Sequence, residues 1–235
     1  MIKSRIAMAG ALLAVAGAAN AGFEVTPAIT TDYDWRGISQ TNPDQDDDLK
    51  PAFQLGLNYA FDNGFYLGGW GSNIDWGPGD PNVELDFFGG YAGGSDETFN
   101  YDLGVNYYSY PSAGSSNFVE LYAGISKGWF SSKLWYSPEF AGKHTSESAF
   151  YLEGNVSVPL PQGLSALGHV GHSFGNYFKT YGPTGGIGKS YSDWSVGLGY
   201  DINKFSLSVK YVDGSDGLNG RFIGMISTTL PWSAD

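Results

Sequence analysis

The stretch Pro51 to Phe61, PAFQLGLNYAF, decides the fold of this chain. Successive side chains of an extended strand point to opposite faces. One face here carries only large apolar side chains: Phe53, Leu55, Leu57, Tyr59 and Phe61. The other face carries only small or polar ones: Gln54, Gly56, Asn58 and Ala60. A helix would mix the two sets, so the pattern predicts a strand with one apolar face.

The same alternation recurs along almost the whole chain and is interrupted by turn signals. Asp62-Asn63-Gly64, directly after the first stretch, is typical of a tight hairpin. Dividing the chain at such signals predicts about twelve strands, with about ten or fourteen as alternatives, joined by connections that alternate between longer and shorter. Bacterial outer-membrane barrels share this order, with short periplasmic turns and longer extracellular loops. We expect the first strand to end with the segment Thr31 to Gln40.

The size of the predicted barrel indicates which way its apolar face points. About eight strands enclose a space that side chains can fill, and larger barrels enclose more. An interior of glycine, asparagine and carboxylates would then hold water, and the apolar face would meet lipid. The expected fold class is therefore an all-β, transmembrane antiparallel up-and-down β-barrel of about 12 strands. The alternative is a secreted soluble β-sandwich, or two stacked barrels, whose exterior would be unusually rich in glycine.

The first 21 residues predict a secretory signal peptide. Lys3 and Arg5 form a basic start, residues 6–19 are apolar, and Ala19-Asn20-Ala21 is an A-x-A cleavage site. The expected domains are a signal peptide at 1–21 and one outer-membrane barrel domain at 22–235. Removing the first 21 residues leaves 235 − 21 = 214, and takes away two of 12 basic and none of 24 acidic residues, so the net charge is 10 − 24 = −14.

An acidic chain without cysteine excludes several classes of function. Nucleic-acid-binding proteins need a basic footprint, so no nucleic acid is expected as a partner. The lack of cysteine excludes disulfides, thiol catalysis and Cys-ligated metals. The histidines are His144, His169 and His172. On a strand, His172 points away from both Ser173 and His169, so neither a nucleophile–base pair nor a zinc pair forms there. We expect no enzyme activity, no metal site and no cofactor.

A family resemblance enters at the segment TDYDWRGISQ, Thr31 to Gln40. This segment resembles the first-strand signature of the TorF-type porin family, catalogued as the Gcw_chp domain of unknown function. Weaker matches follow through the rest of the chain, at residues 69–73, 85–86, 90–91, 107–111, 120–122 and 193–197. The resemblance implies an outer-membrane β-barrel, a porin, in a Gram-negative bacterium. It brings no substrate and no catalytic residues. Such barrels end on an aromatic residue that the assembly machinery reads, whereas this chain continues past Trp232 to Asp235.

If the apolar faces meet lipid, the alternation places charged side chains in the lumen. The candidate channel-lining residues are Asp32, Asp34, Arg36, Glu84, Asp86, Asp102, Glu120, Lys133, Glu139, Glu153, Asp193 and Lys210. Nine carboxylates against three cations give a negative interior, which predicts a mild preference for cations. The structural interpretation is that Arg36 and its neighbours form buried ion pairs that hold the barrel together.

Aromatic side chains form a second candidate set in the lumen, comprising Tyr108, Tyr110, Tyr122, Trp135 and Tyr151. These rings could guide a sugar, a nucleoside or an organic cation by stacking and cation–π contact, or they could simply fill space. The longest predicted loop, Phe174 to Ser190, is glycine-rich and is the candidate plug or gate. The acidic segment Asp44 to Asp48 is expected to be a solvated loop, because an EF-hand spacing is lacking.

The function that these observations predict is a porin-like channel for passive diffusion of small hydrophilic solutes, with mild cation preference. The alternative is a structural or ligand-binding outer-membrane barrel with an occluded lumen. The expected location is the cell outer membrane, reached through the periplasm after cleavage of the signal peptide. The expected partners are outer-membrane lipid and lipopolysaccharide, small hydrophilic solutes, and the barrel-assembly and periplasmic chaperone machinery.

Overall fold

A computed structural model of the chain describes residues 22–42, 49–143, 145–182 and 188–231. The predicted signal peptide, the acidic segment Asp44 to Asp48, His144 and Trp232 lie outside the described residues.

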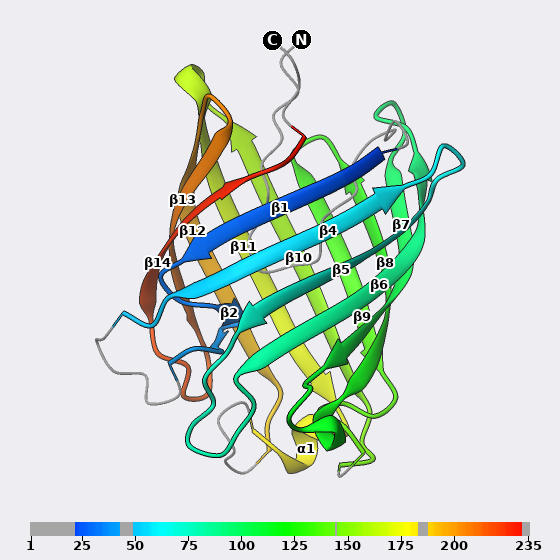
Figure 1. Cartoon of the computed structure of the whole chain (residues 1–235), viewed down its shortest axis with the longest axis vertical. Coiled ribbons are helices and arrows are strands. Elements are labelled where there is room, and N and C mark those ends of the chain that lie inside the picture. The colour runs from blue at the N-terminus through cyan, green and yellow to red at the C-terminus, as the bar shows by residue number, and fades with distance from the viewer. Residues whose placement is uncertain (1–21, 43–48, 144, 183–187, 232–235) are drawn as a thin grey trace.

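Twelve strands of the described chain form one closed barrel (Figure 1). Each strand pairs antiparallel with its neighbours in sequence, and β1 closes the ring by pairing with both β4 and β14. The barrel strands are β1 Gly22–Thr30, β4 Ala52–Ala60, β5 Phe65–Asn73, β6 Val83–Gly94, β7 Asn100–Ser109, β8 Phe118–Lys127, β9 Phe130–Ser137, β10 Ala149–Pro159, β11 Leu164–Gly175, β12 Tyr191–Ile202, β13 Phe205–Gly214 and β14 Arg221–Thr228. The predicted fold class is confirmed.

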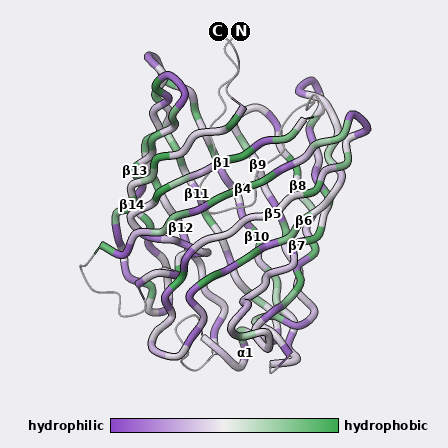
Figure 2. The backbone as a smooth tube through the Cα atoms, in the orientation of Figure 1, coloured by the Kyte–Doolittle hydropathy of each residue, from purple (hydrophilic) through white to green (hydrophobic). Residues whose placement is uncertain are grey.

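The predicted alternation is the organising pattern of the wall. Along β4 every second residue, from Ala52 to Ala60, is buried, and the residues between them are exposed. Phe53 is 64% exposed and Leu55 47% exposed, so the apolar face points outward. Hydrophobic and hydrophilic residues also alternate along parts of other strands (Figure 2). A surface this rich in exposed phenylalanine, leucine and valine is tolerated in hydrocarbon rather than in water.

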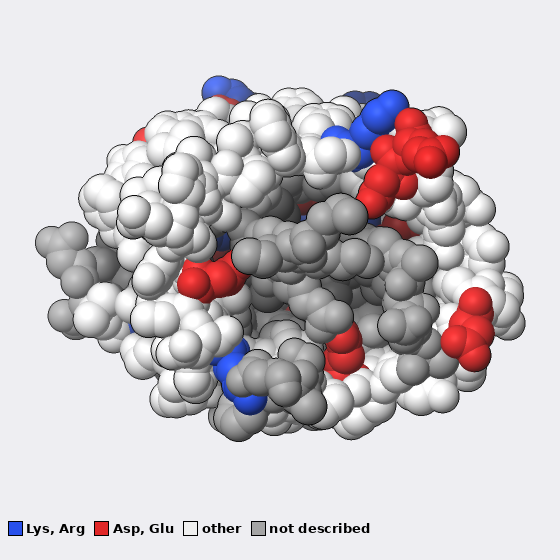
Figure 3. Space-filling view, turned by 90° about the horizontal axis from the view of Figure 1, so that it is seen from above, with Lys and Arg blue, Asp and Glu red and all other residues white. Residues whose placement is uncertain are grey.

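The two ends of the barrel differ in the length of their connections. The end near the chain termini carries the short turns, at residues 61–64, 95–99, 128–129, 160–163 and 203–204 (Figure 1). The opposite end carries the long connections, at residues 31–51, 74–82, 110–117, 138–148, 176–190 and 215–220. We refer to these as the short-turn end and the long-loop end. Seen from the short-turn end, charged side chains lie around the rim and in the mouth, and most of the surface is uncharged (Figure 3).

The first strand differs from the prediction. It ends at Thr30, and the segment Thr31 to Asn42 leaves the wall and folds into the lumen as a small hairpin of β2 Asp34–Trp35 and β3 Ile38–Ser39 (Figure 1). We call residues 31–42 the lumen hairpin. A strand of two residues is too short to show an alternating pattern. The polar residues of this segment also fit the lumen-facing side of a wall strand, which is the position that the sequence predicts for them. The charged residues of the segment lie in the lumen as predicted, but they are carried by this hairpin and not by the first wall strand.

Helical structure is confined to connections in the described chain: the 3-10 turns η1 Gly114–Ser116 and η2 Pro161–Gly163, and the single turn α1 Tyr177–Thr180. None of the described helices is long and apolar enough to cross a membrane. α1 belongs to the predicted plug loop and packs its buried Phe178 against Phe140 and Tyr191 at the long-loop end.

A lysine on the outer face of β4 tests the orientation of the wall. We expect Leu57→Lys to lower the free energy of unfolding in lipid vesicles by about 2–4 kcal/mol, because a charge at mid-bilayer is costly. The control is Ser208→Lys, whose side chain lines the interior cavity, with an expected change below about 1 kcal/mol. Urea-induced unfolding measures both, and equal costs would contradict the orientation.

Candidate functional site

The lumen hairpin turns on two residues, Arg36 and Gly37, that both have positive φ, of 54° and 83°. Such a two-residue loop with both residues left-handed matches the type I′ turn that joins tightly twisted strands. Gly37 is also required by space, because a Cβ there would lie 2.7 Å from both Asp193 Cβ on β12 and Leu218 Cδ1. The tip of the hairpin therefore packs closely against β12 and Leu218.

Arg36 fixes the tip through a bidentate ion pair with Glu120 on β8. Its Nη1 donates to Oε1 at 2.9 Å and its Nη2 to Oε2 at 2.6 Å. Tyr108 Oη donates to the same carboxylate at 2.9 Å. Glu120 is 1% exposed and Arg36 8% exposed, so both charges are held in a dry environment by each other.

Arg221, the first residue of β14, fixes the base of the hairpin. Its guanidinium pairs with the carboxylates of Asp32 and Asp34 and donates to the carbonyl oxygen of Gly37 at 2.9 Å. On the other side, Tyr33 Oη donates to Glu84 Oε1 on β6 at 3.1 Å. The hairpin is thus tied to three separated parts of the wall.

Aromatic packing supplements these polar contacts. Trp35 stacks on Phe140 with ring centroids 5.8 Å apart and planes 10° apart. The Arg36 guanidinium carbon lies 4.6 Å from the Trp35 ring centroid and 4.3 Å from that of Tyr151. Tyr33 packs on Trp70 at 5.2 Å. The hairpin therefore places aromatic rings as well as charges inside the barrel.

Burial and charge act together on the titration of the hairpin. Burial would lower the pKa of Arg36, but the Glu120 carboxylate more than offsets it, so the pKa lies above its ordinary value. Burial raises the pKa of Asp34, and the Arg221 charge only partly opposes this. Burial, followed by the charges of Glu84 and Asp86, raises the pKa of Tyr33, so its hydroxyl stays protonated and donates.

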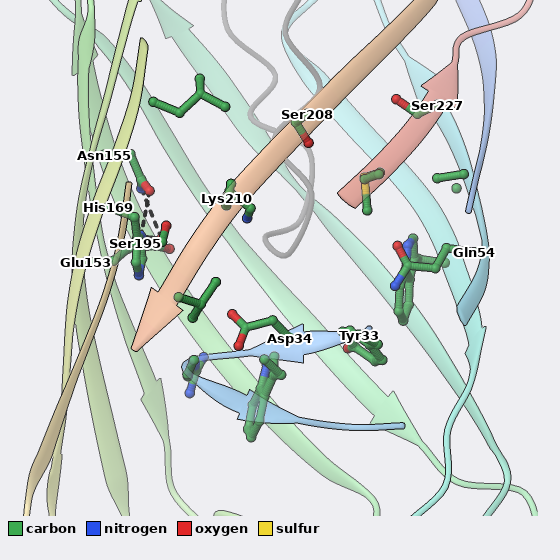
Figure 4. Close-up of a pocket in the computed structure, with 18 of the residues that line it drawn as sticks. Tyr33, Asp34, Gln54, Glu153, Asn155, His169, Ser195, Ser208, Lys210 and Ser227 are labelled. Atoms are coloured by element: carbon green, nitrogen blue, oxygen red, sulfur yellow. Dashed lines mark hydrogen bonds and ion pairs between the residues drawn. The ribbon is translucent and has the colours of Figure 1, made fainter. Parts of the chain in front are cut away.

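The hairpin separates two cavities. One of about 170 Å³ lies on the short-turn side, and its wall includes Asn155, His169, Ser208 and Ser227 (Figure 4). The other, of about 350 Å³, lies on the long-loop side and is lined largely by aromatic rings, among them Phe140 and Tyr177. Trp35 lines both cavities. The hairpin therefore lies between the two cavities.

The structure places most of the predicted lumen charges inside the barrel, each with a partner. Besides those on the hairpin, Glu153 accepts from Trp135 Nε1 at 2.8 Å, Asp102 pairs with Lys133 at 2.9 Å, and Asp86 accepts from Asn106. Asp193 accepts from Tyr151 and lies 2.9 Å from Nε2 of His169, and Lys210 lines the smaller cavity. Glu139 is the exception, because it lies exposed in the connection after β9.

The predicted lumen aromatics also lie inside, where Tyr108, Tyr110, Tyr122, Trp135 and Tyr151 are each 3–5% exposed. Tyr122 and Trp135 pack together at 4.7 Å, and Tyr151 covers a glycine of the next strand, Gly171, where no Cβ would fit. This burial supports the space-filling interpretation for most of these rings.

Sequence reasoning missed two lumen residues, Arg221 and His169. Arg221 shares the inward parity of Ile223 and Ser227 on β14. His169 shares the parity of Ser165 and Ser173 on β11. The alternation that identified the other lining residues contained the signal for both. In the described chain no group of three or more His, Cys, Asp or Glu side chains is arranged to hold a metal ion.

Comparison with known proteins identifies relatives of the chain. Residues 16–224 match a family model described as a bacterial protein of unknown function, Gcw_chp. No curated protein matches the sequence.

Solved porin structures share the fold at low sequence identity. The KdgM porin superposes with a TM-score of 0.56 at 12% identity, over 87% of this chain and 98% of that one. KdgM in complex with disordered oligogalacturonate gives 0.54 at 13% identity, over 88% and 97%. The NanC porin gives 0.52 at 10% identity, over 88% and 98%. At these identities the likeness concerns the fold.

The ion pair of the hairpin tip predicts a large and coupled loss of stability. We expect Arg36→Met alone to cost about 3–5 kcal/mol, because it leaves Glu120 buried without a counter-charge. Adding Glu120→Gln should recover part of that loss, which a double-mutant cycle of unfolding free energies measures. As a control, Lys189→Met breaks the exposed pair with Asp216 and should cost less than about 1 kcal/mol. Additive costs at Arg36 and Glu120 would contradict the pairing.

Proposed function

We propose that this chain, which belongs to the Gcw_chp family, is an outer-membrane channel for the passive diffusion of small hydrophilic solutes. The observation that carries the proposal is a closed β-wall whose outer face is apolar and whose inner face is polar and charged. A wall of this kind satisfies all its backbone polar groups by closure and can stand in hydrocarbon around a polar path. The resemblance to TorF-type porins supports the same function.

The cellular route and partners form part of the proposal. The chain would be exported with a cleaved signal peptide of residues 1–21, guided by periplasmic chaperones and inserted by the barrel-assembly machinery. Its apolar belt would contact outer-membrane lipid and lipopolysaccharide, with the short turns in the periplasm and the long loops outside. No enzyme activity and no cofactor are part of this function.

The lumen charge supports a mild preference for cations. The network of lumen contacts described above contains eight carboxylates, namely Asp32, Asp34, Glu84, Asp86, Asp102, Glu120, Glu153 and Asp193. Four cations accompany them, namely Arg36, Lys133, Lys210 and Arg221, which gives 4 − 8 = −4 with histidine neutral. A negative lumen attracts cations and repels anions. The oligogalacturonate of the KdgM complex is an anion. A negative lumen would repel a ligand of that charge.

The lumen hairpin would set the selectivity of the channel. It crosses the lumen from β1 to β8 and β12, and solutes would pass between its polar edge and the wall. The same hairpin also supports the second candidate function, that of a barrel with an occluded lumen. A barrel crossed by a segment with two sets of ion pairs could also serve as an occluded structural or ligand-binding barrel.

Conductance distinguishes the two functions. We expect the refolded protein to form steps of stable conductance in planar bilayers, and a KCl gradient to give a reversal potential shifted toward that of potassium. A reversal potential of zero, or one shifted toward that of chloride, would refute the cation preference. A protein that inserts and does not conduct would favour the occluded barrel.

Displacing the hairpin tip tests whether it limits the current. We expect Gly37→Val to raise single-channel conductance, because its side chain would meet Asp193 and Leu218 and its φ of 83° suits glycine. The control is Gly79→Val, at a φ of 94° with no atom within 4 Å of a Cβ, which should leave conductance unchanged. If both variants conduct like the unmodified chain, the hairpin does not limit the flow.

A further inference from the structure

His169 lies in the lumen and would add one positive charge there when its ring is protonated. It lies on β11, lines the smaller cavity, and its side chain is 22% exposed. The close-up of the cavity shows it beside Asn155 and Glu153 on the wall, above the lumen hairpin (Figure 4). The side chain is therefore both in contact with the lumen and part of a hydrogen-bond network.

The first ring nitrogen faces an acceptor. Nδ1 lies 2.7 Å from Asn155 Oδ1. The orientation of that amide is fixed, because Asn155 Nδ2 donates to Glu153 Oε2 at 3.0 Å while Trp135 donates to the other carboxylate oxygen. An amide oxygen can only accept, so Nδ1 of His169 carries a proton.

The second ring nitrogen faces an acceptor as well. Nε2 lies 2.9 Å from Asp193 Oδ1, and the hydroxyl of Tyr151 lies 3.0 Å from Nε2 and 3.1 Å from that carboxylate oxygen. The hydroxyl has one proton to give. If it donated to Nε2, the lone pairs of Nε2 and Asp193 would face each other at 2.9 Å. A proton on Nε2 satisfies both contacts, and the ring is then an imidazolium.

We propose that His169 is a titratable positive charge of the channel and makes its preference for cations depend on pH. This inference rests on the proposed channel function. The charged and titratable groups around the ring are Glu153 and Tyr151 from β10, Asp193 from β12, Arg36 and Asp34 from the hairpin, and Lys210 from β13. The two nearest carboxylate oxygens, of Asp193 and Glu153, lie 2.9 and 3.9 Å from the ring nitrogens and face the positive charge of the imidazolium.

Loss of that proton changes both charge and structure. The lumen becomes more negative by one charge, so cation preference rises with pH. Nε2 and Asp193 then repel each other, and Tyr151 turns its proton to the ring. The carboxylate of Asp193 supports the hairpin tip through the close approach of Gly37 to its Cβ, so the change lies beside the constriction.

Nitrogen NMR of the ring tests the protonation state without any need for conduction. The full mature chain is refolded in detergent with ¹⁵N-labelled histidine, and His169→Gln and His172→Gln assign the signals. His172 is the matched control, because it lies on the same strand and is exposed on the outer face, where Nδ1 hydrogen-bonds the Ser192 hydroxyl and the ring stacks on Phe174. We expect both His169 nitrogens to carry a proton at the acid end of the pH range, and one of them to have lost it at the basic end. A neutral His169 ring throughout the range would overturn the proposal.

Reversal potentials in a KCl gradient test the effect on the channel. We expect the reversal potential of the unmodified chain and of His172→Gln to shift toward that of potassium between pH 5 and 9, a range chosen to span histidine titration. His169→Gln should lose part of this shift. If conducting His169→Gln keeps the whole shift, His169 does not set selectivity. If no variant conducts, the proposed channel function fails while the NMR result still decides the protonation state.

Discussion

The structure depends on closure of the sheet, because every backbone polar group of a wall in hydrocarbon needs a partner within the protein. The seam that closes the ring, between β1 and β14, has the fewest paired residues of the described wall. It pairs Ala28 with Ser227 through Thr30 with Met225, and resumes at Val25 with Leu230 in the same register. Between them lies Pro27, which has no N–H to give. Thr26 and Thr229 bridge the gap through their hydroxyls, 3.2 Å apart.

Closure also explains why the lumen is organised as a network of pairs. A ring of twelve strands encloses more space than its own inward side chains fill, and the chain fills it with the lumen hairpin. Placing Arg36, Asp32 and Asp34 there removes them from bulk water, so each needs a counter-charge on the wall. Glu120 and Arg221 supply these counter-charges. The same side chains therefore hold the hairpin in place and set the electric field inside the barrel.

The parts that sequence predicts well are those governed by alternation. Strand number, eleven of the twelve strand positions and the inward side of Glu84, Glu120 and Trp135 all follow from a period of two. The hairpin at 31–42 does not, because its strands are two residues long and its fold depends on contacts with β6, β8 and β14 that are distant in sequence. Alternation gives the face on which a side chain lies. It cannot tell that Arg36 and Glu120 meet, nor that both nitrogens of His169 face acceptors.

The placement of the counter-charges constrains the order of assembly. The hairpin follows β1, so it is among the first segments of the barrel to emerge, yet Arg221 lies 189 residues after Asp32. Until β14 is in place, Asp32 and Asp34 lack this partner, and their transfer into a closed lumen would carry unpaired charge. Docking of the hairpin is therefore coupled to formation of the β1–β14 seam, since Thr30 and Thr31 also bond to Gly224 of β14. The segment that occupies the lumen thus takes its final position only when the wall around it is complete.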